Sequence, residues 1–388
     1  MMRWRSRQWV ITLTIVAPVL AAAVYLVLFQ TGDRPASSAL TEALGGDDLE
    51  GYARVTGPRA LRFPEDHGPH PDYRNEWWYY TGQLSDEQGR EFGFQVTFFR
   101  IALSPEPIRE PAPWRTRQLY MGHFALTDIE GERFYAFERF ARGTDELAGA
   151  QADPYRVWLG GWQAQALAHT PDEALFPHRL SLAADRVALD VVLDDVLGRV
   201  AHGDNGYSLK GPGRGDASMY YAYPRLQAEG QLRLGEQRFA VTGTAWMDRE
   251  WSTSVLAEHQ VGWDWFALQL DDGSALMVYQ LRDQAGRPDE FGYGAYLDAG
   301  GVVQQLAHDE VELEVVRRWR SDESGRRYPV AWRLAVPRLD LSLAIEARLD
   351  HQEWTATVPY WEGAVRISGE RHGETVSGRG YVELTGYD

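Results

Sequence analysis

The chain has no cysteine among its 388 residues. This absence excludes disulfide bonds, thiolate catalysis, thiolate metal ligands and a lipid-modified N-terminal cysteine. Lysine is almost as scarce, because Lys210 is the only one in the sequence. Schiff-base chemistry would therefore have to rest on that single residue, and we do not expect it.

Clustered positive charge is missing as well. The formal net charge is −17, and no stretch carries the basic stripe that phosphate binding requires. The sequence therefore excludes nucleic acid as a partner, and the acidity indicates a soluble surface.

Helical periodicity is the third absence. No apolar stripe at i, i+3, i+4 spacing runs longer than about two turns. Aromatic residues and 38 glycines are instead plentiful, which suits twisted antiparallel sheet and tight turns. Short segments separated by turn signals predict an all-β fold of the barrel or sandwich type. The expected strands after the first, which begins at 75, are 92–103, 120–128, 133–140, 155–162, 164–169, 179–184 and 187–193.

The N-terminus carries the longest apolar run. Three arginines lie within Met1–Arg7, and 21 uncharged residues follow at Trp9–Phe29. About 20 apolar residues cross a bilayer, so residues 1–30 are predicted to be an anchor with its arginines on the cytoplasmic side. Residues 31–60 are expected to be a flexible tether. The folded part would then lie on the periplasmic side of the inner membrane, or be secreted if cleavage occurs at Ala21–Ala23.

An internal repeat indicates two similar barrels. Trp77–Asp86 aligns without gaps on Trp263–Asp272, an offset of 186 residues, and each copy is followed by a glycine turn and another strand. With a boundary between Gln227 and Gly235, the predicted domains are 61–232 and 233–388.

The densest chemistry lies in Gly243–Asp272, where Arg249 stands among tryptophans and acids. The tryptophans and acids are Trp246, Trp251, Trp263, Trp265, Asp248, Glu250, Glu258 and Asp264. Apolar surroundings raise the pKa of a carboxyl group unless a cation holds it ionised. The cluster is therefore either a tuned acid or a structural network, in which Arg249 pairs with Glu250, Asp264 or Glu76 at the domain interface while the tryptophans form core.

Six motifs in order carry a family resemblance. They are NEWWYYTGQL (75–84), GHFALTD (122–128), MYYAYPRL (219–226), AWMDREW (245–251), GWDWFALQLDDG (262–273) and YWEGAV with GRGYVELTGY (360–387). From Phe63 onward the chain resembles the lipocalin-like AttH/CrtC family, which contains carotenoid 1,2-hydratases, predicted secreted hydrolases and AttH proteins encoded beside ABC-transporter genes.

The resemblance implies two tandem lipocalin-like barrels with a hydrophobic ligand site, and a partnership with an ABC-type permease. For the hydratase branch it implies acid-catalysed addition of water to an isoprenoid double bond. In that branch a histidine usually follows the motif aspartate, whereas this chain has Arg249. Arginine cannot exchange a proton at working pH, so the difference favours an AttH-like member.

The candidate catalytic residues are Asp248, Asp264, Arg249, Glu250 and His123. The candidate ligand-binding residues are Glu76, Trp77, Tyr79, Trp251, Trp263, Trp265, Tyr221 and Tyr279. A lone strand histidine such as His123 is more often structural than catalytic. No metal or cofactor is predicted, because the histidines at 67 and 70 lie in a proline-rich loop. A serine hydrolase is not supported, since no G-x-S-x-G elbow is present.

The leading prediction is an exported, membrane-anchored protein that binds a lipophilic small molecule in an aromatic cleft near the domain interface. The alternative is a hydratase- or isomerase-type lyase with Asp248 as its acid. A structural envelope protein without a small-molecule site is the third hypothesis. A binder requires an apolar cavity, an enzyme also requires an acid opening into it, and a structural protein would have its barrels filled by aromatic side chains.

Overall fold

The computed structural model describes residues 49–108, 115–167, 175–254 and 256–388. The predicted anchor (1–30) and most of the predicted tether lie outside these residues. Within them, no helix has the length and apolar character needed to cross a membrane. The described helices are three single turns of 3-10 helix, η1 (Glu65–His67), η2 (His308–Glu310) and η3 (Pro337–Leu339), so the predicted all-β class is confirmed.

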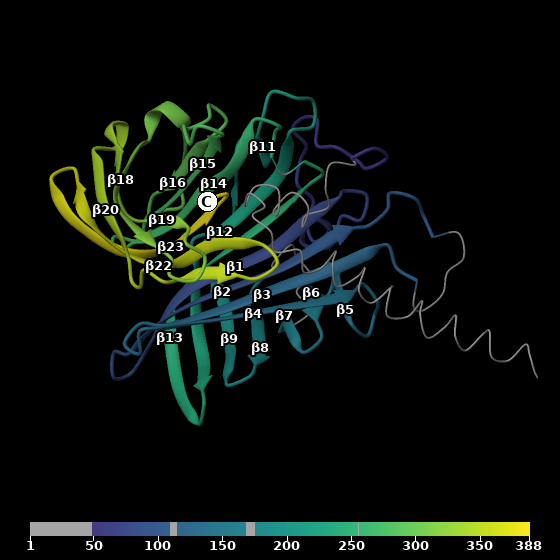
Figure 1. The fold of residues 1–388 in the computed structure, drawn as a ribbon, viewed down its shortest axis with the longest axis horizontal. Coiled ribbons are helices and arrows are strands. Elements are labelled where there is room, and N and C mark those ends of the chain that lie inside the picture. Colours follow the sequence, from purple (N-terminus) through teal and green to yellow (C-terminus); the bar gives the residue numbers. More distant parts are fainter. Residues whose placement is uncertain (1–48, 109–114, 168–174, 255) are drawn as a thin grey trace, which may run out of the picture. The chain divides into compact units, whose positions relative to one another are not determined.

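The first sheet has thirteen antiparallel strands in the order β4-β3-β2-β1-β13-β12-β9-β8-β7-β6-β5, with β10 and β11 also paired to β12. Its strands are β1 (Asn75–Asp86), β2 (Glu91–Ala102), β3 (Gln118–Asp128), β4 (Arg133–Arg142), β5 (Ala148–Gln151), β6 (Arg156–Leu159), β7 (Trp162–Ala166), β8 (His178–Ala184), β9 (Val187–Asp195), β10 (Val200–Ala201), β11 (Tyr207–Leu209), β12 (Ala217–Leu234) and β13 (Gln237–Ser252). The sheet curls into a barrel-like layer (Figure 1).

The second sheet has ten antiparallel strands in the order β17-β16-β15-β14-β23-β22-β20-β19-β18, with β21 paired to β22. Its strands are β14 (Gln260–Leu270), β15 (Ala275–Asp283), β16 (Tyr293–Leu297), β17 (Val303–Ala307), β18 (Glu312–Arg320), β19 (Arg327–Val336), β20 (Leu341–Ala347), β21 (Glu353–Thr355), β22 (Pro359–Arg371) and β23 (Glu374–Thr385). It is a half-barrel beside the first sheet (Figure 1).

The two sheets repeat one topology. In each, four consecutive strands (β1–β4 and β14–β17) form a meander, and the last hairpin (β12–β13 and β22–β23) returns to lie beside the first strand. Tyr79 lies opposite Asp248, and its repeat equivalent Trp265 lies opposite Glu383. Asp248 and Glu383 therefore occupy equivalent positions in the two halves.

The division between the sheets falls between β13 and β14, not at residue 232. Strand β13 pairs with both β1 and β12 along its length. The turn at Gly235, where φ is +62°, closes a hairpin between β12 and β13 rather than linking two domains. A glycine turn between two long strands looks the same in sequence in either case.

Alternation along the strands separates two kinds of surface. On β1, Trp78 and Tyr80 point into the core of the first sheet, while Trp77 and Tyr79 point the other way. The same holds on β14, where Phe266 enters the second core. The outward faces of the two sheets meet in a third, aromatic-rich cluster.

Two glutamines at repeat-equivalent positions join these outward faces. The Gln83 side-chain amide donates to the carbonyls of Val365 and Gly380 at 2.9 and 2.7 Å. The Gln269 amide donates to those of Pro224 and Ala245 at 2.7 and 2.9 Å. Each glutamine thus binds the backbone of the opposite sheet.

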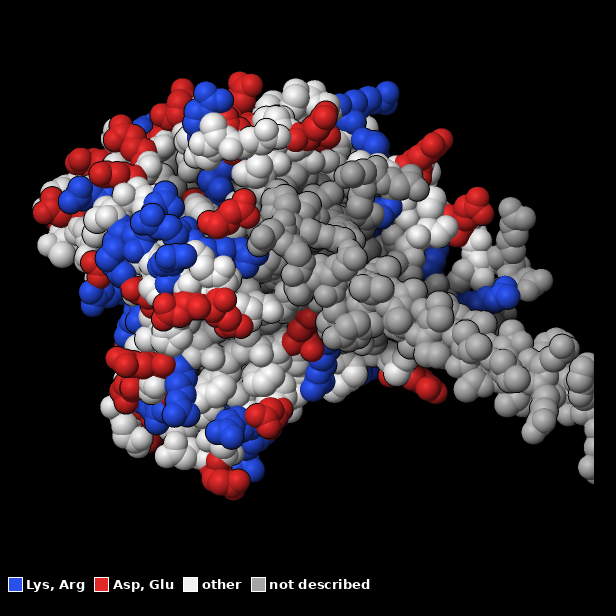
Figure 2. Space-filling view, in the orientation of Figure 1, with Lys and Arg blue, Asp and Glu red and all other residues white. Residues whose placement is uncertain are grey.

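On the face seen in Figure 2, basic and acidic side chains are interspersed. This distribution agrees with the absence of a basic stripe in the sequence.

Candidate active site

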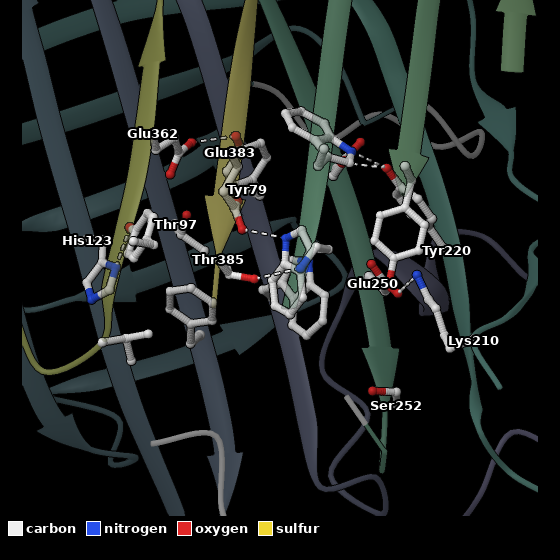
Figure 3. Close-up of a pocket in the computed structure, with 18 of the residues that line it drawn as sticks. Tyr79, Thr97, His123, Lys210, Tyr220, Glu250, Ser252, Glu362, Glu383 and Thr385 are labelled. Carbon is white, nitrogen blue, oxygen red and sulfur yellow. Dashed lines mark hydrogen bonds and ion pairs between the residues drawn. The ribbon is translucent and has the colours of Figure 1, made fainter. Parts of the chain in front are cut away.

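A cavity lies between the outward faces of the two sheets. It holds about 910 Å³ of space free of protein atoms when its open mouth is counted. Both sheets line it, as Figure 3 shows. The lining residues are Trp77, Tyr79, Thr97, Phe99, Met121, His123, Lys210, Tyr220, Asp248, Glu250, Ser252, Ser254, Trp263, Trp265, Tyr279, Val358, Tyr360, Glu362, Glu383 and Thr385.

Asp248 presents a buried carboxyl group to this cavity from the C-terminal half of β13. The Tyr220 hydroxyl donates to its Oδ2 at 2.6 Å, and the Trp246 indole donates to its Oδ1 at 2.7 Å. Burial raises the pKa of Asp248 to about 8, with the nearby charges of Glu250 and Glu383 adding to the rise and the two hydrogen bonds opposing it. The group is therefore largely protonated at neutral pH, as a general acid must be.

Two further carboxyl groups reach the cavity from the second sheet. Glu383 on β23 accepts a hydrogen bond from the Trp263 indole at 2.8 Å, and burial raises its pKa to about 7. Glu362 lies opposite it on β22 and accepts from the Tyr79 hydroxyl. Burial, and then the charge of Glu383, raise the pKa of Glu362 well above its usual value. Burial thus raises the pKa of all three carboxyl groups, to about 7 for Glu383 and about 8 for Asp248.

An ion pair closes one side of the cavity. The Lys210 ammonium lies 3.0 Å from a Glu250 carboxylate oxygen, with both side chains more than 90% buried. The ammonium also lies 4.0 Å from the ring centroid of Tyr279, where the ring face attracts a cation.

His123 lies at the opposite side of the cavity from Lys210 (Figure 3). Its Nε2 is 3.1 Å from Glu138 and its Nδ1 is 2.7 Å from the Tyr360 hydroxyl. A carboxylate can only accept, so Nε2–H donates to Glu138 and Nδ1 accepts from Tyr360. Burial lowers the pKa of His123, which keeps the ring neutral at neutral pH.

Eight of the thirteen residues predicted for the site line the cavity. They are Asp248, Glu250, His123, Trp77, Tyr79, Trp263, Trp265 and Tyr279. Tyr79 and Trp265, equivalent in the repeat, meet edge to face with ring centroids 5.1 Å apart. Much of the wall is therefore aromatic.

The other five predicted residues lie elsewhere. Glu76, Arg249, Trp251 and Tyr221 belong to the inward side of the first sheet, where Glu76 forms ion pairs with Arg100 and Arg249. These arginines hold the pKa of the fully buried Glu76 below its usual value, although burial alone would raise it. This is the paired structural network that the sequence offered as an alternative, but it lies inside the first sheet and not at the interface.

Asp264 is the fifth. It shares β14 with Trp263 and Trp265 but points to the opposite face, as alternation requires. There it pairs with Arg282 at 2.9 Å and accepts from the Tyr387 hydroxyl at 2.9 Å. It is a structural acid away from the cavity.

The residues that sequence reasoning missed come mainly from the closing motifs. Glu362, Glu383 and Tyr360 carry no local mark of a site, and the single lysine, Lys210, looks like an ordinary loop residue. If the repeat is extended from β1 and β14 to the strands beside them, Glu383 is found to be equivalent to Asp248. That equivalence is the signal that could have identified Glu383.

Two barrel-like antiparallel sheets with a shared aromatic cavity define the class of tandem lipocalin-like proteins. Within that class, the chain belongs to the AttH-like family, whose model matches residues 54–387. The family expected from the sequence motifs is therefore confirmed.

Relatives of known structure support this assignment. A crystal structure of a protein described as AttH from Nitrosomonas europaea is 36% identical, with a TM-score of 0.75 over 87% of this chain and 100% of that one. Kievitone hydratase from Nectria haematococca is 16% identical, with a TM-score of 0.65 over 86% of this chain and 95% of the hydratase. At 16% identity, the similarity to kievitone hydratase shows a shared fold and nothing further.

A curated relative is dehydratase asqC from Emericella nidulans. It is 22% identical over 178 residues, which are 43% of this chain and 50% of the dehydratase. The match thus spans about half the length of that relative.

Proposed function

We propose that this protein is a hydro-lyase, which adds water to, or removes water from, a lipophilic substrate bound between the two sheets. The observation that carries the proposal is Asp248, a carboxyl group with a pKa raised to about 8 that opens into an aromatic cavity. Two relatives, kievitone hydratase and dehydratase asqC, are named for the addition or removal of water, which is the same class of reaction.

In the hydration direction, protonated Asp248 donates its proton to one carbon of the substrate double bond. The other carbon becomes cationic beside Trp77, Tyr79 and Trp265, whose ring faces stabilise positive charge by about 0.5–2 kcal/mol each when water is excluded. A water molecule then bonds to that carbon and loses a proton to Glu383, whose pKa of about 7 suits a base at neutral pH. Dehydration is the same sequence in reverse.

Arg249 does not count against this chemistry. The histidine expected after the motif aspartate would stand on the inward side of the first sheet, where Arg249 pairs with Glu76. The acid in the cavity is the aspartate itself, and its proton does not depend on the next residue.

Binding of a lipophile without turnover is the second candidate. The observation that favours it is the apolar character of the wall, which Phe99, Met121 and Val358 extend beyond the aromatic side chains named above. An open cavity between the sheets argues against the structural envelope reading. Membrane attachment and an ABC-type permease partner remain predictions.

The test uses the full chain, purified gently, beside Asp248→Asn and a surface control, Asp190→Asn. Each of the three proteins is incubated with a total lipid extract in water enriched in oxygen-18 (heavy oxygen). The lipophilic molecules are then analysed by mass spectrometry. A hydro-lyase produces species that differ by one water, in the wild type and Asp190→Asn alone; the heavy oxygen appears in the hydrated species when water is added and is absent from the dehydrated species when water is removed. If a lipophile binds all three proteins without any such change, the binding candidate replaces the enzyme.

A further inference from the structure

Lys210 stands out because it is the one lysine of the sequence and is nevertheless only 5% exposed. It follows β11, and hydrogen bonds hold its backbone on both sides. Its N–H donates to the carbonyl of Asp216 at 2.8 Å, and its own carbonyl accepts from the Gln260 side chain at 2.8 Å. The loop therefore directs this side chain into the cavity.

Lys210 is the only lysine or arginine among the described residues that line the cavity. Within the part of the chain that the structure describes, its ammonium makes one polar contact, with Glu250 at 3.0 Å, although an ammonium group carries three N–H donors. The rings of Tyr279 and Tyr220, with centroids at 4.0 and 5.4 Å, occupy its other sides without accepting conventional hydrogen bonds. At least one donor is thus available on the cavity side.

A purely structural role explains this arrangement poorly. Burying a lysine–glutamate pair costs several kcal/mol of desolvation per ion, and apolar residues of similar volume often give equal or greater stability. Here the pair stands at the edge of an apolar cavity rather than in a core, and it does not join the two sheet interiors. A cation in that place has a use when a ligand brings an oxygen to it.

We infer that Lys210 binds an anionic oxygen, of a carboxylate, phenolate or enolate, at one end of the ligand. The ligand is then an amphiphile with an aromatic or isoprenoid body along Trp77, Trp263 and Trp265. Its one charged oxygen lies beside Tyr220, which Figure 3 shows next to Lys210. Glu250 holds the ammonium in place until the ligand enters. The inference rests on the proposed function only in using the same cavity.

Two probes of equal shape separate charge recognition from apolar binding. Isothermal titration calorimetry of the full chain compares 2-naphthoate with its uncharged counterpart 2-naphthamide. A charge-assisted hydrogen bond corresponds to roughly a tenfold or greater gain in affinity, so the wild type is expected to prefer naphthoate by about that factor.

The variants assign that preference to one side chain. Lys210→Met is expected to weaken naphthoate binding about tenfold and to change naphthamide binding by less than about twofold. Retained naphthamide binding shows that the cavity is still folded. Lys210→Arg keeps the charge and much of the preference, whereas Glu250→Gln strengthens naphthoate binding because the ammonium is no longer neutralised.

Three results would overturn the inference. The first is that the wild type shows no preference for naphthoate, or binds neither probe. The second and third are that Lys210→Met keeps the preference unchanged, or that it loses affinity for both probes equally. Turnover plays no part in these titrations. An inactive enzyme that still shows the lysine-dependent preference would refute the proposed reaction and leave the anionic-oxygen site standing.

Discussion

Replacing Asp248 with asparagine removes a carboxyl group that is protonated in the folded protein at neutral pH but ionised in the unfolded chain. The pKa of Asp248 rises from an ordinary value of 3.8 to about 8 in the folded protein, chiefly because burial penalises the charged form. Between these values the folded state binds one more proton than the unfolded state. The stability that this group contributes is complete below pH 3.8 and is lost as the pH rises through 8.

The magnitude follows from the difference between the two pKa values. One pKa unit corresponds to about 1.36 kcal/mol, so a rise of about four units corresponds to roughly 6 kcal/mol over the whole range. Asparagine carries no titrating proton and adds only an offset that is independent of pH, from its altered contacts with Trp246 and Tyr220. Relative to the wild type, Asp248→Asn should therefore gain stability steadily as the pH rises.

The assay is urea unfolding followed by tryptophan fluorescence, at pH values from about 5 to about 9. We expect the free energy of unfolding of Asp248→Asn to rise relative to the wild type by several kcal/mol across this range. Asp190→Asn, which breaks an exposed pair with Arg179, should follow the wild-type curve. Parallel curves for Asp248→Asn and the wild type would show that the carboxyl group is not protonated in the fold, and the proposed acid would fall with it.

Three other perturbations test the surrounding structure. Tyr220→Phe removes a hydrogen bond that lowers the pKa of Asp248, so the alkaline limit of turnover should move up by about one pH unit or more, as measured in a pH–rate profile. Glu76→Gln leaves Arg100 and Arg249 without their buried counter-charge, so the free energy of unfolding measured in urea should fall by about 3–5 kcal/mol. The exposed control Glu346→Gln should lower it by less than about 1 kcal/mol, and equal losses would refute the buried network. Gln83→Ala leaves two carbonyls of the second sheet without their donor and should cost about 1–3 kcal/mol, with a similar loss for Gln269→Ala; a loss in only one of them would contradict the equivalence of the two contacts.

Strand alternation made much of the fold predictable. Trp77 and Tyr79 share one face and Trp78 and Tyr80 the other, as the pattern requires. Alternation alone does not tell which face meets the core and which meets the second sheet, since both are aromatic here. That choice depends on a partner sheet almost two hundred residues away, which no local pattern encodes.

The acids show where sequence reasoning stops. Asp248 and Asp264 look alike in sequence, each beside tryptophans, yet one opens into the cavity and the other pairs with Arg282. Separating them requires the register between β13 and β1 and between β14 and β23, which side-chain packing sets. Glu383 is missed for the same reason, because its resemblance to Asp248 is positional and not local.

The division of each strand into an inward and an outward face keeps two kinds of selection apart. Side chains that build the cores, such as Trp78 and Phe266, point into the two cores, whereas those that line the cavity stand on the opposite faces of the same strands. Substitution at an outward position reshapes the cavity without opening a void in either core. Such a scaffold can change the lining of its cavity while keeping its fold, and the two halves differ in this way, with Asp248 in one and Glu383 at the equivalent position of the other.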